Sequence, residues 1–260
     1  MARRVLHDTF FKQAKAEGYV ARSAYKLQQI QEAKRLIKKS DKVLDLGCAP
    51  GAWLQVAAEL VGTGGAVVGI DLQTIVHRFG GPVPIRHVVG DVFKTPASVL
   101  LDELAVACGM DPAPSPATSG GGSDPAPKPL PPHKRADVAP LIPLSRDVAA
   151  PPRQSPRSGP MFDVVLSDMA PNTTGHGDHE RSIALCDRVV ELLPDLLKRG
   201  GACAIKVFEG GDYPRLLKDM AGVFEAAKGY KPEASRAVSK EMYIVATGYR
   251  GRPVRRTDPL

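Results

Sequence analysis

The sequence predicts an α/β fold in which helices cover both faces of a doubly wound, mainly parallel sheet. Apolar runs of strand length alternate with amphipathic segments of helix length along most of the chain. A turn with two glycines follows the first of these strands, and acidic residues end several of them. In such folds the ligand cleft lies beyond the carboxyl ends of the strands, so the turn and the acids are expected there.

The elements are expected in this order. Residues 1–20 predict a short basic helix that ends at Gly18, and Ser23 is expected to cap a second helix with Leu27 and Ile30 on its apolar face. Strands are expected at 43–46, 66–72, 85–89, 162–167, 202–208 and 242–247. Further helices are expected from Trp53, over 180–198 with Gly200 and Gly201 closing it, and near 213–226.

Composition divides the chain into segments. A basic helical arm is expected at 1–40, the main domain at 41–249, and a basic flexible tail at 250–260. Residues 111–160 hold 14 of the 24 prolines and the run Gly120-Gly121-Gly122. Such a segment cannot bury a core, so it predicts a disordered insertion within the main domain.

The charge of the chain is unevenly distributed. The net charge is +7, and residues 1–42 alone hold 11 Lys/Arg against 4 Asp/Glu. The remaining residues therefore sum to zero, which is typical of a neutral domain with a polyanion-binding extension. A solvated basic helix or part of an organellar targeting segment is the alternative.

The cysteines and the hydropathy pattern bear on the compartment. Four cysteines without a C-x-x-C pair indicate reduced thiols rather than a disulfide framework or a zinc site. No apolar run approaches the roughly 20 residues that cross a bilayer. We expect a cytoplasmic monomer that does not enter a membrane, with mitochondrion or plastid as the alternative if the native N-terminus is longer.

The turn after the first strand favours a cationic cofactor. Gly47 and Gly51 are four residues apart, unlike the G-x-G-x-x-G pattern that binds a pyrophosphate, and Asp45 stands just before them. A carboxylate here repels a pyrophosphate but suits S-adenosylmethionine, which carries a sulfonium and an ammonium group. Asp71 follows Gly51 by 20 residues, the spacing at which an acid commonly accepts hydrogen bonds from ribose hydroxyls. A tight turn without a ligand is the alternative.

Four ionisable residues occupy positions that ordinary patterning does not explain. Lys206 lies inside an apolar strand, where an unpaired ammonium is costly. Asp168 ends a strand, Glu241 begins the last one, and Lys26 lies on the second helix. If the first, fourth and fifth strands are neighbours, Asp168 and Lys206 project over one cleft. The residues alone do not bring all four together, and each is also compatible with a surface charge or a structural ion pair.

At these residues the chain resembles the FtsJ/RrmJ-like ribose 2′-O-methyltransferases of RNA, from about Tyr19 to Tyr249. The shared motifs are ARSAYKL, LDLGCAPGAW, GIDL, GDVF, SDMAPNTTG, AIKVFEGG and SKEMY. The resemblance implies a Rossmann-like, S-adenosylmethionine-dependent methyltransferase fold with a seven-stranded sheet. Ala52 replaces the second glycine of the usual Gly-Gly-Trp, and the proline-rich insertion is longer than in the bacterial pattern.

The resemblance also implies the site residues. The catalytic Lys-Asp-Lys-Glu tetrad of the family falls on Lys26, Asp168, Lys206 and Glu241. Its cofactor contacts fall on Gly51, Trp53, Asp71, Asp91 and Asp168. With their neighbours in the same turns, the predicted cofactor site also includes Asp45, Gly47, Ala49, Pro50, Leu72 and Val92.

The implied reaction is S-adenosylmethionine-dependent 2′-O-methylation of a ribose, with Lys206 as the general base and no metal. A lysine base must be neutral, which burial and a second lysine favour and nearby acids oppose. The implied substrate is a uridine of large-subunit ribosomal RNA or of the assembled large subunit, as in the bacterial and mitochondrial branch. The tRNA anticodon loop, the mRNA cap and a non-catalytic RNA-binding module are the alternatives.

Overall fold

The computed structural model describes residues 2–111, 160–171, 178–210, 212–235 and 239–254, and within them seven strands form one sheet. The strands are β1 Lys42–Leu46, β2 Ala66–Asp71, β3 Ile85–Val89, β4 Phe162–Ser167, β5 Leu197–Phe208, β6 Phe224–Tyr230 and β7 Glu241–Tyr249. The helices are α1 Ala2–Glu17, α2 Ala24–Lys34, α3 Ala52–Val61, α4 Ala97–Ala107, α5 Asp178–Leu196 and α6 Tyr213–Val223. The predicted α/β class with a seven-stranded sheet is confirmed.

The strand order is β3-β2-β1-β4-β5-β7-β6, and every neighbouring pair is parallel except β5·β7 and β7·β6. The chain runs outward from β1 to β3 and then returns to the other side of β1 with β4. Order reverses between β1 and β4, the point at which doubly wound sheets open a crevice for a ligand. The first, fourth and fifth strands are therefore neighbours, which is the condition under which Asp168 and Lys206 were expected to project over one cleft.

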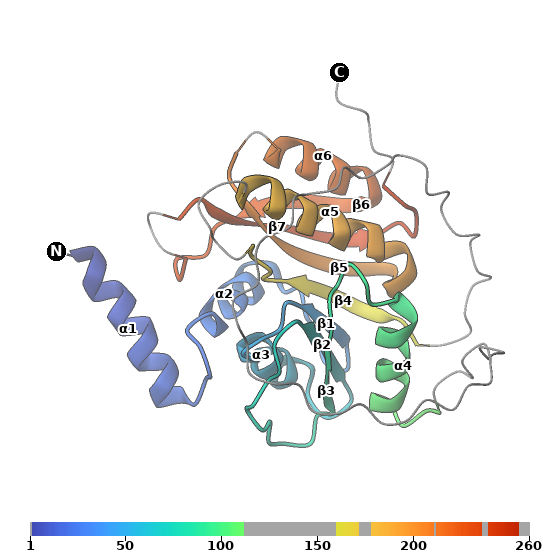
Figure 1. Ribbon diagram of the computed structural model, residues 1–260, viewed down its shortest axis with the longest axis horizontal. Helices are drawn as coiled ribbons and strands as arrows, with labels where there is room; N and C mark the ends of the chain where they lie inside the picture. The colour runs from blue at the N-terminus through green and yellow to red at the C-terminus, as the bar shows by residue number, and fades with distance from the viewer. Residues whose placement is uncertain (1, 112–159, 172–177, 211, 236–238, 255–260) are drawn as a thin grey trace, which may run out of the picture. The chain divides into compact units, whose positions relative to one another are not determined.

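Helices cover the sheet on both faces (Figure 1). Helices α2 and α3 pack on one face through a buried cluster that includes Leu27, Ile30 and Leu54. Helices α4, α5 and α6 pack on the other through a second cluster. Alternate residues of β1 go to opposite faces, because side chains alternate along a strand: Val43 belongs to the first cluster, and Leu44 and Leu46 to the second.

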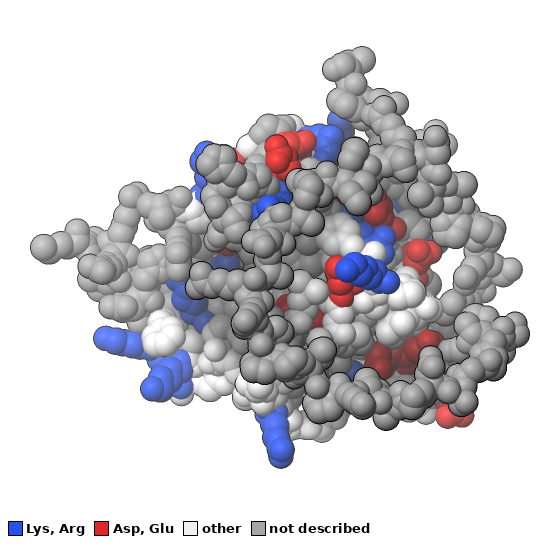
Figure 2. Space-filling view, viewed as in Figure 1, with Lys and Arg blue, Asp and Glu red and all other residues white. Residues whose placement is uncertain are grey.

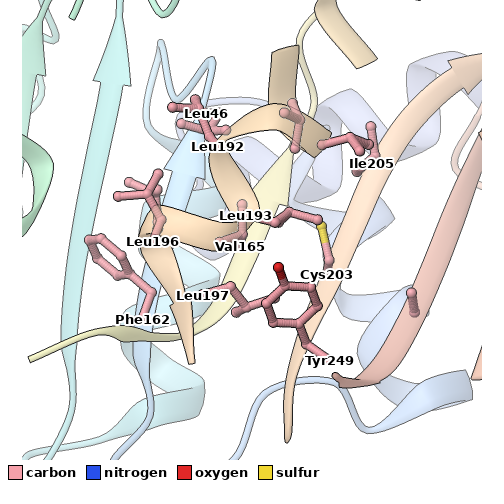
Figure 3. Close-up of a cluster of buried hydrophobic side chains, with 14 of the residues drawn as sticks. Leu46, Phe162, Val165, Leu192, Leu193, Leu196, Leu197, Cys203, Ile205 and Tyr249 are labelled. Carbon is pink, nitrogen blue, oxygen red and sulfur yellow. The ribbon is translucent and has the colours of Figure 1, made fainter. Parts of the chain in front are cut away.

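The second cluster is built around α5 (Figure 3). Leu192, Leu193 and Leu196 of α5 face Leu46, Val165 and Ile205 of the three central strands. Each fully buried side chain of this kind contributes about 1.5–3 kcal/mol relative to an exposed one. This packing fixes the central strands against each other and so the positions of their carboxyl ends.

Several predicted elements need correction. The helix expected over 180–198 ends at Leu196, and Gly200 and Gly201 lie inside β5, which begins at Leu197. The helix expected near 213–226 ends at Val223, where the edge strand β6 begins. Edge strand β6 (FEAAKGY) has residues that favour a helix, and only its pairing with β7 makes it a strand. Helix α4 lies outside the sequence expectations altogether.

The start of α2 also differs. Ser23 has α-helical backbone angles and makes no side-chain cap hydrogen bond, so the predicted cap is wrong. Its carbonyl instead accepts a hydrogen bond from the indole nitrogen of Trp53, at 2.8 Å. Gly18 follows α1 with φ of +81°, as expected for the residue that ends a helix.

The N-terminal helices pack against the rest of the described chain. Helix α2 shares its core cluster with α3 and the sheet, and Ala14 of α1 lies in a small cluster with Tyr25 and Ala234. The domain boundaries at 40/41 and 249/250 stay predictions. Nearly all of the predicted insertion at 111–160 and the last six residues of the predicted tail lie outside the described residues. Among the helices of the described ranges, none has the length and apolar character to span a membrane.

Candidate active site

The four residues of the predicted tetrad lie together at the carboxyl ends of β4 and β5. The Lys206 amino group is 3.0 Å from Asp168 Oδ1, and Lys26 Nζ is 3.9 Å from the same oxygen. Lys26 Nζ is also 2.6 Å from Glu241 Oε1. Lys206 donates a second hydrogen bond to the backbone carbonyl of Asp168. The two lysines and two acids, which the sequence alone did not bring together, therefore form one mutually compensated cluster.

Strand register places three of the four. Ser167 pairs with Ile205, so Asp168 and Lys206 each follow by one residue on adjacent parallel strands. Strand β7 runs antiparallel to β5 and pairs Tyr243 with Lys206 and Glu241 with Phe208. The start of β7 therefore lies beside the end of β5, which brings Glu241 to the same edge. Residues distant in the sequence thus meet at this edge.

Helix α2 supplies the fourth member. Lys26 is only 9% exposed, and its neighbours Tyr25 and Leu27 are buried. Trp53 of α3 holds the start of α2 through its hydrogen bond to Ser23 and stacks on Tyr243, with ring centroids 5.7 Å apart. The helix is thereby fixed against both α3 and β7. Lys206, on the strand, is 7% exposed.

Tyr243 is a site residue that was not predicted. Its hydroxyl donates to Asp168 Oδ1 at 2.6 Å and lies 3.4 Å from Glu241 Oε1. Burial, with Asp168 and Glu241 nearby, raises the pKa of Tyr243 well above its ordinary value, so the hydroxyl stays a donor. Tyr243 follows Glu241 by two residues in a strand, so the two side chains lie on the same face of the sheet. This spacing within SKEMY could have predicted that Tyr243 lies near the site.

The glycines of the turn between β1 and α3 are required by packing. Gly47 and Gly51 have φ of +81° and +110°. A Cβ on Gly47 would lie 2.4 Å from Met169 Cγ, and one on Gly51 would lie 2.7 Å from Phe79 Cζ. Both side chains come from outside the turn, Met169 from just after Asp168. Because the two glycines lack a Cβ, the side chains of Met169 and Phe79 can pack directly against the backbone of the turn.

Asp45 is fully buried, and neither carboxylate oxygen has a hydrogen-bond partner among the described residues. Burial raises the pKa of Asp45 well above its ordinary value, and the nearby Asp168 and Asp71 add to this effect. An unpaired carboxylate in such a place is costly to the folded chain. A cation bound between these three acids would offset that cost.

Asp71 and Asp91 each hold the turn that follows their strand. Asp71 accepts hydrogen bonds from the backbone N–H groups of Ala49 (3.0 Å) and Gln73 (2.8 Å), one on each oxygen. Asp91 accepts one from Phe93 at 2.9 Å. A carboxylate offers about four acceptor sites, so both acids keep capacity for a ligand hydroxyl or amine. Asp71 thereby joins the end of β2 to the glycine turn.

The predicted cofactor residues therefore fit S-adenosylmethionine in chemistry. Asp45 offers two carboxyl oxygens without a hydrogen-bond partner among the described residues, and Asp71 and Asp91 offer acceptors at neighbouring strand ends. Leu72 is 68% exposed beside Asp71, whereas Val92 is buried. Trp53 is 3% exposed, and its described contacts are with Ser23 and Tyr243. A contact of Trp53, Ala49 or Pro50 with the cofactor stays a prediction.

A separate pocket of about 240 Å³ lies between α3 and the segment after β2. It contains no residue of the tetrad and none of the predicted cofactor residues. Its lining comes from Gln55, Ala58, Glu59, His77, Phe79, Gly80, Gly81, Pro82, Val83 and Ile85.

Comparison with known proteins shows the family of the chain. The model of the FtsJ-like methyltransferase family matches residues 19–249. The chain belongs to the FtsJ-like methyltransferase family. This family resemblance was predicted from the motifs over nearly the same residues. The enzyme class, a methyltransferase, follows from the family.

Two curated relatives of this FtsJ-like methyltransferase are named ribosomal RNA large subunit methyltransferase E. The Haloarcula marismortui protein is 36% identical over 96% of this chain and 78% of its own. The Syntrophobacter fumaroxidans protein is 35% identical over 92% of this chain and 94% of its own. A Plasmodium falciparum protein assigned as a ribosomal RNA methyltransferase has a crystal structure with TM-score 0.59, 20% identity, and coverage of 90% of this chain and 100% of that chain. That likeness supports the fold alone.

Proposed function

We propose that this FtsJ-like methyltransferase transfers a methyl group from S-adenosylmethionine to a ribose 2′-hydroxyl, that of a uridine, in large-subunit ribosomal RNA. The observation that carries the proposal is the contact of Lys206 with both the carboxylate and the carbonyl of Asp168. The names of the curated relatives support the ribosomal substrate. Lys206 is the general base of the proposed reaction.

The hydrogen bonds of Lys206 explain how an amine here serves as a base. A neutral lysine amine has two N–H groups and one lone pair. The two groups are used by the carboxylate and the carbonyl oxygen of Asp168. The lone pair is then left for the proton of the ribose hydroxyl, which must be removed as that hydroxyl attacks.

Lys26, Asp168 and Glu241 fix the direction of this lone pair. Glu241 holds the Lys26 ammonium at 2.6 Å, and the positive charge of Lys26 faces Asp168. Asp168 in turn accepts a hydrogen bond from the hydroxyl of Tyr243 on the same oxygen that contacts Lys206. The orientation aligns the base with its substrate, which is a large part of what such a reaction needs.

Asp45, Asp71 and Asp91 would hold the cofactor. Asp45 supplies the unpaired buried carboxylate for a positive group, and Asp71 and Asp91 supply acceptors for hydroxyl and amine groups. The bound cofactor supplies a methyl group made electrophilic by its sulfonium charge. The chain's own part is to hold the ribose so that its 2′-oxygen faces that methyl while the amine of Lys206 takes the hydroxyl proton.

Basic side chains on α1 support an RNA substrate. Lys12 and Lys15 are exposed on this helix, and Figure 2 shows Lys and Arg side chains where α1 lies in Figure 1. Such charges bind phosphates and fix the position of an RNA without reading its sequence. A cytoplasmic location and a monomeric state stay predictions.

The deciding experiment is transfer of labelled methyl from S-adenosylmethionine to large ribosomal subunits that lack the modification. We expect label in an alkali-resistant 2′-O-methyl dinucleotide, lost by at least about a hundredfold in Lys206→Ala. Lys218→Ala, an exposed lysine of α6, is the matched control and should keep full activity. Cofactor binding by each variant, measured by calorimetry, shows that the proteins remain folded.

The other substrates are outcomes of the same experiment. Label on tRNA or on capped RNA but not on the subunit would keep the chemistry and reject the ribosomal substrate. Label on a base instead of a ribose would reject the proposed reaction. Binding of RNA without transfer and without cofactor binding would favour a non-catalytic RNA-binding module.

A further inference from the structure

The tetrad residue Glu241 has a hydrogen-bond donor outside the predicted site. Ser235 Oγ lies 2.9 Å from Glu241 Oε1, the same oxygen that Lys26 approaches to 2.6 Å. Ser235 is buried and lies between β6 and β7. A hydrogen bond from a hydroxyl to a carboxylate is shorter and stronger than one between two neutral groups. Ser235 thereby limits the directions in which Glu241 Oε1 can point.

The segment that carries Ser235 is held by α2. The side-chain oxygen of Gln29 accepts a hydrogen bond from the backbone N–H of Ala234 at 3.0 Å. The backbone carbonyl of Gln29 accepts one from the hydroxyl of Tyr230 at 3.2 Å. Gln29 follows Lys26 by three residues, so both lie on one face of the helix. Helix α2 therefore presents the lysine and holds the segment that orients its acid.

Packing supports the same segment from α1. Ala234 is buried with Ala14 of α1 and Tyr25 of α2, and Phe10 packs against this cluster. Ser235 also donates its backbone N–H to the carbonyl of Pro232, at 3.0 Å. The packing of Ala234 and the backbone hydrogen bond of Ser235 to Pro232 therefore fix the backbone from which the hydroxyl of Ser235 reaches Glu241.

We propose that Ser235, held by Gln29, is a positioning residue for the methyl-transfer reaction. Its hydroxyl orients Glu241, and Glu241 orients the ammonium of Lys26. Lys26 in turn places its positive charge near Asp168, the acid that contacts the base Lys206. Neither residue touches the reacting atoms, so both act through Glu241. This inference rests on the proposed function, because it concerns the rate of that reaction.

The test measures kcat and KM of methyl transfer for Ser235→Ala and Ser235→Thr. We expect kcat of Ser235→Ala to fall by roughly tenfold or more with cofactor affinity unchanged, since a bond to a charged group is lost. Ser235→Thr keeps the hydroxyl and should recover most of the rate. Ser98→Ala, a half-buried serine of α4, is the matched control with wild-type kcat.

A double-mutant cycle separates positioning from general stability. In a Glu241→Ala background, Ser235→Ala should lower kcat no further, because the residue it orients is gone. A purely structural residue would lower activity equally in both backgrounds. Gln29→Leu should reproduce the loss in the wild-type background, and Gln29→Glu, which keeps the acceptor, should not.

The outcomes distinguish the two proposals. If the wild-type enzyme transfers no methyl to any RNA, the proposed function fails, and the positioning role for that reaction fails with it. If the wild type transfers methyl and Ser235→Ala has an unchanged kcat, the positioning role is rejected. Equal losses in both backgrounds, or equal losses for Ala and Thr at position 235, also reject it.

Discussion

Asp168 connects the two lysines of the site. Its Oδ1 atom is 3.0 Å from Lys206, 3.9 Å from Lys26 and 2.6 Å from the hydroxyl of Tyr243. One carboxylate oxygen thus faces the amino groups of two lysines and one buried hydroxyl donor. This concentration of donors on one oxygen makes the orientation of each neighbour depend on the others.

The hydroxyl of Tyr243 is expected to stabilise the fold as well as the site. Tyr243→Phe keeps the ring that stacks on Trp53 and removes the donor to Asp168. We expect the free energy of unfolding to fall by about 1.5–3 kcal/mol, the usual contribution of a hydrogen bond to a charged group. Urea denaturation measures this difference. An unchanged midpoint would mean that the hydroxyl of Tyr243 adds no stability beyond the contacts of Asp168 with Lys206 and Lys26.

The raised pKa of Asp45 leads us to expect that the stability of the folded chain depends on pH. Its folded-state pKa is raised by burial, so the folded protein holds the proton more tightly than the unfolded chain. The stability from that proton is complete below the unfolded pKa of about 3.9 and is lost as pH rises through the folded value. Asp45→Asn cannot ionise and avoids this loss. Without cofactor, the variant should be the more stable protein near pH 7.

The measurement compares urea midpoints of wild type and Asp45→Asn from pH 4 to pH 8. The advantage of the variant should shrink as pH falls towards the unfolded pKa of about 3.9, below which Asp45 is protonated in both states. A difference that does not change with pH would contradict the assignment of a raised pKa to Asp45.

At the scale of elements, the turn between β1 and α3 is fixed by segments outside it. Met169 follows β4 and occupies the space beside Gly47, while Phe79 follows β2 and occupies the space beside Gly51. The glycine turn therefore joins the ends of three strands. Its sequence identifies the turn, but the neighbours that require glycine come from distant parts of the chain.

Gly47 and Gly18 form a matched pair that tests this packing. Both have φ of +81°, but a Cβ on Gly18 meets nothing within 4 Å, whereas one on Gly47 meets Met169. Gly18→Ala should cost about 1–2 kcal/mol of unfolding free energy for its backbone conformation alone. Gly47→Ala should cost more, since it adds the contact with Met169. Thermal and urea unfolding of both variants measure the difference.

The double variant Gly47→Ala/Met169→Ala provides the check. Removing the Met169 side chain should recover part of the loss caused by Gly47→Ala, so the two changes should not be additive. Strict additivity would show that Met169 does not restrict position 47.

At the scale of the molecule, the exposed charges of α1 predict RNA binding that weakens with salt. Lys12→Ala/Lys15→Ala should weaken binding and reduce the slope of log affinity against log salt by roughly 1–2, because each contact with a phosphate releases a counterion. Fluorescence anisotropy with a ribosomal RNA fragment measures the slope.

Lys218→Ala/Lys228→Ala, exposed on α6 and β6, is the control for this charge change. It removes the same charge from another part of the surface and should leave the slope nearly unchanged. Equal effects of the two pairs would mean that net charge, not α1, determines binding.

Local pattern was enough for the fold class, the central strands, the glycine turn and the acids at the strand ends. These features depend on apolar periodicity and on residues a few positions apart, which a single sequence displays. The pattern misjudged β6, whose Ala, Glu and Lys residues favour a helix. It also misjudged the end of α5, because the pairing of Leu197 with Phe162 draws that residue into the sheet.

The tertiary structure alone decided how the site residues meet. Motif resemblance predicted the tetrad, but only the register of β4, β5 and β7 brings Asp168, Lys206 and Glu241 to one edge. Tyr243 and Ser235 escaped prediction because each is an ordinary residue until its hydroxyl meets a partly buried carboxylate. Contacts between residues far apart in the chain depend on packing, and packing leaves little trace in local sequence.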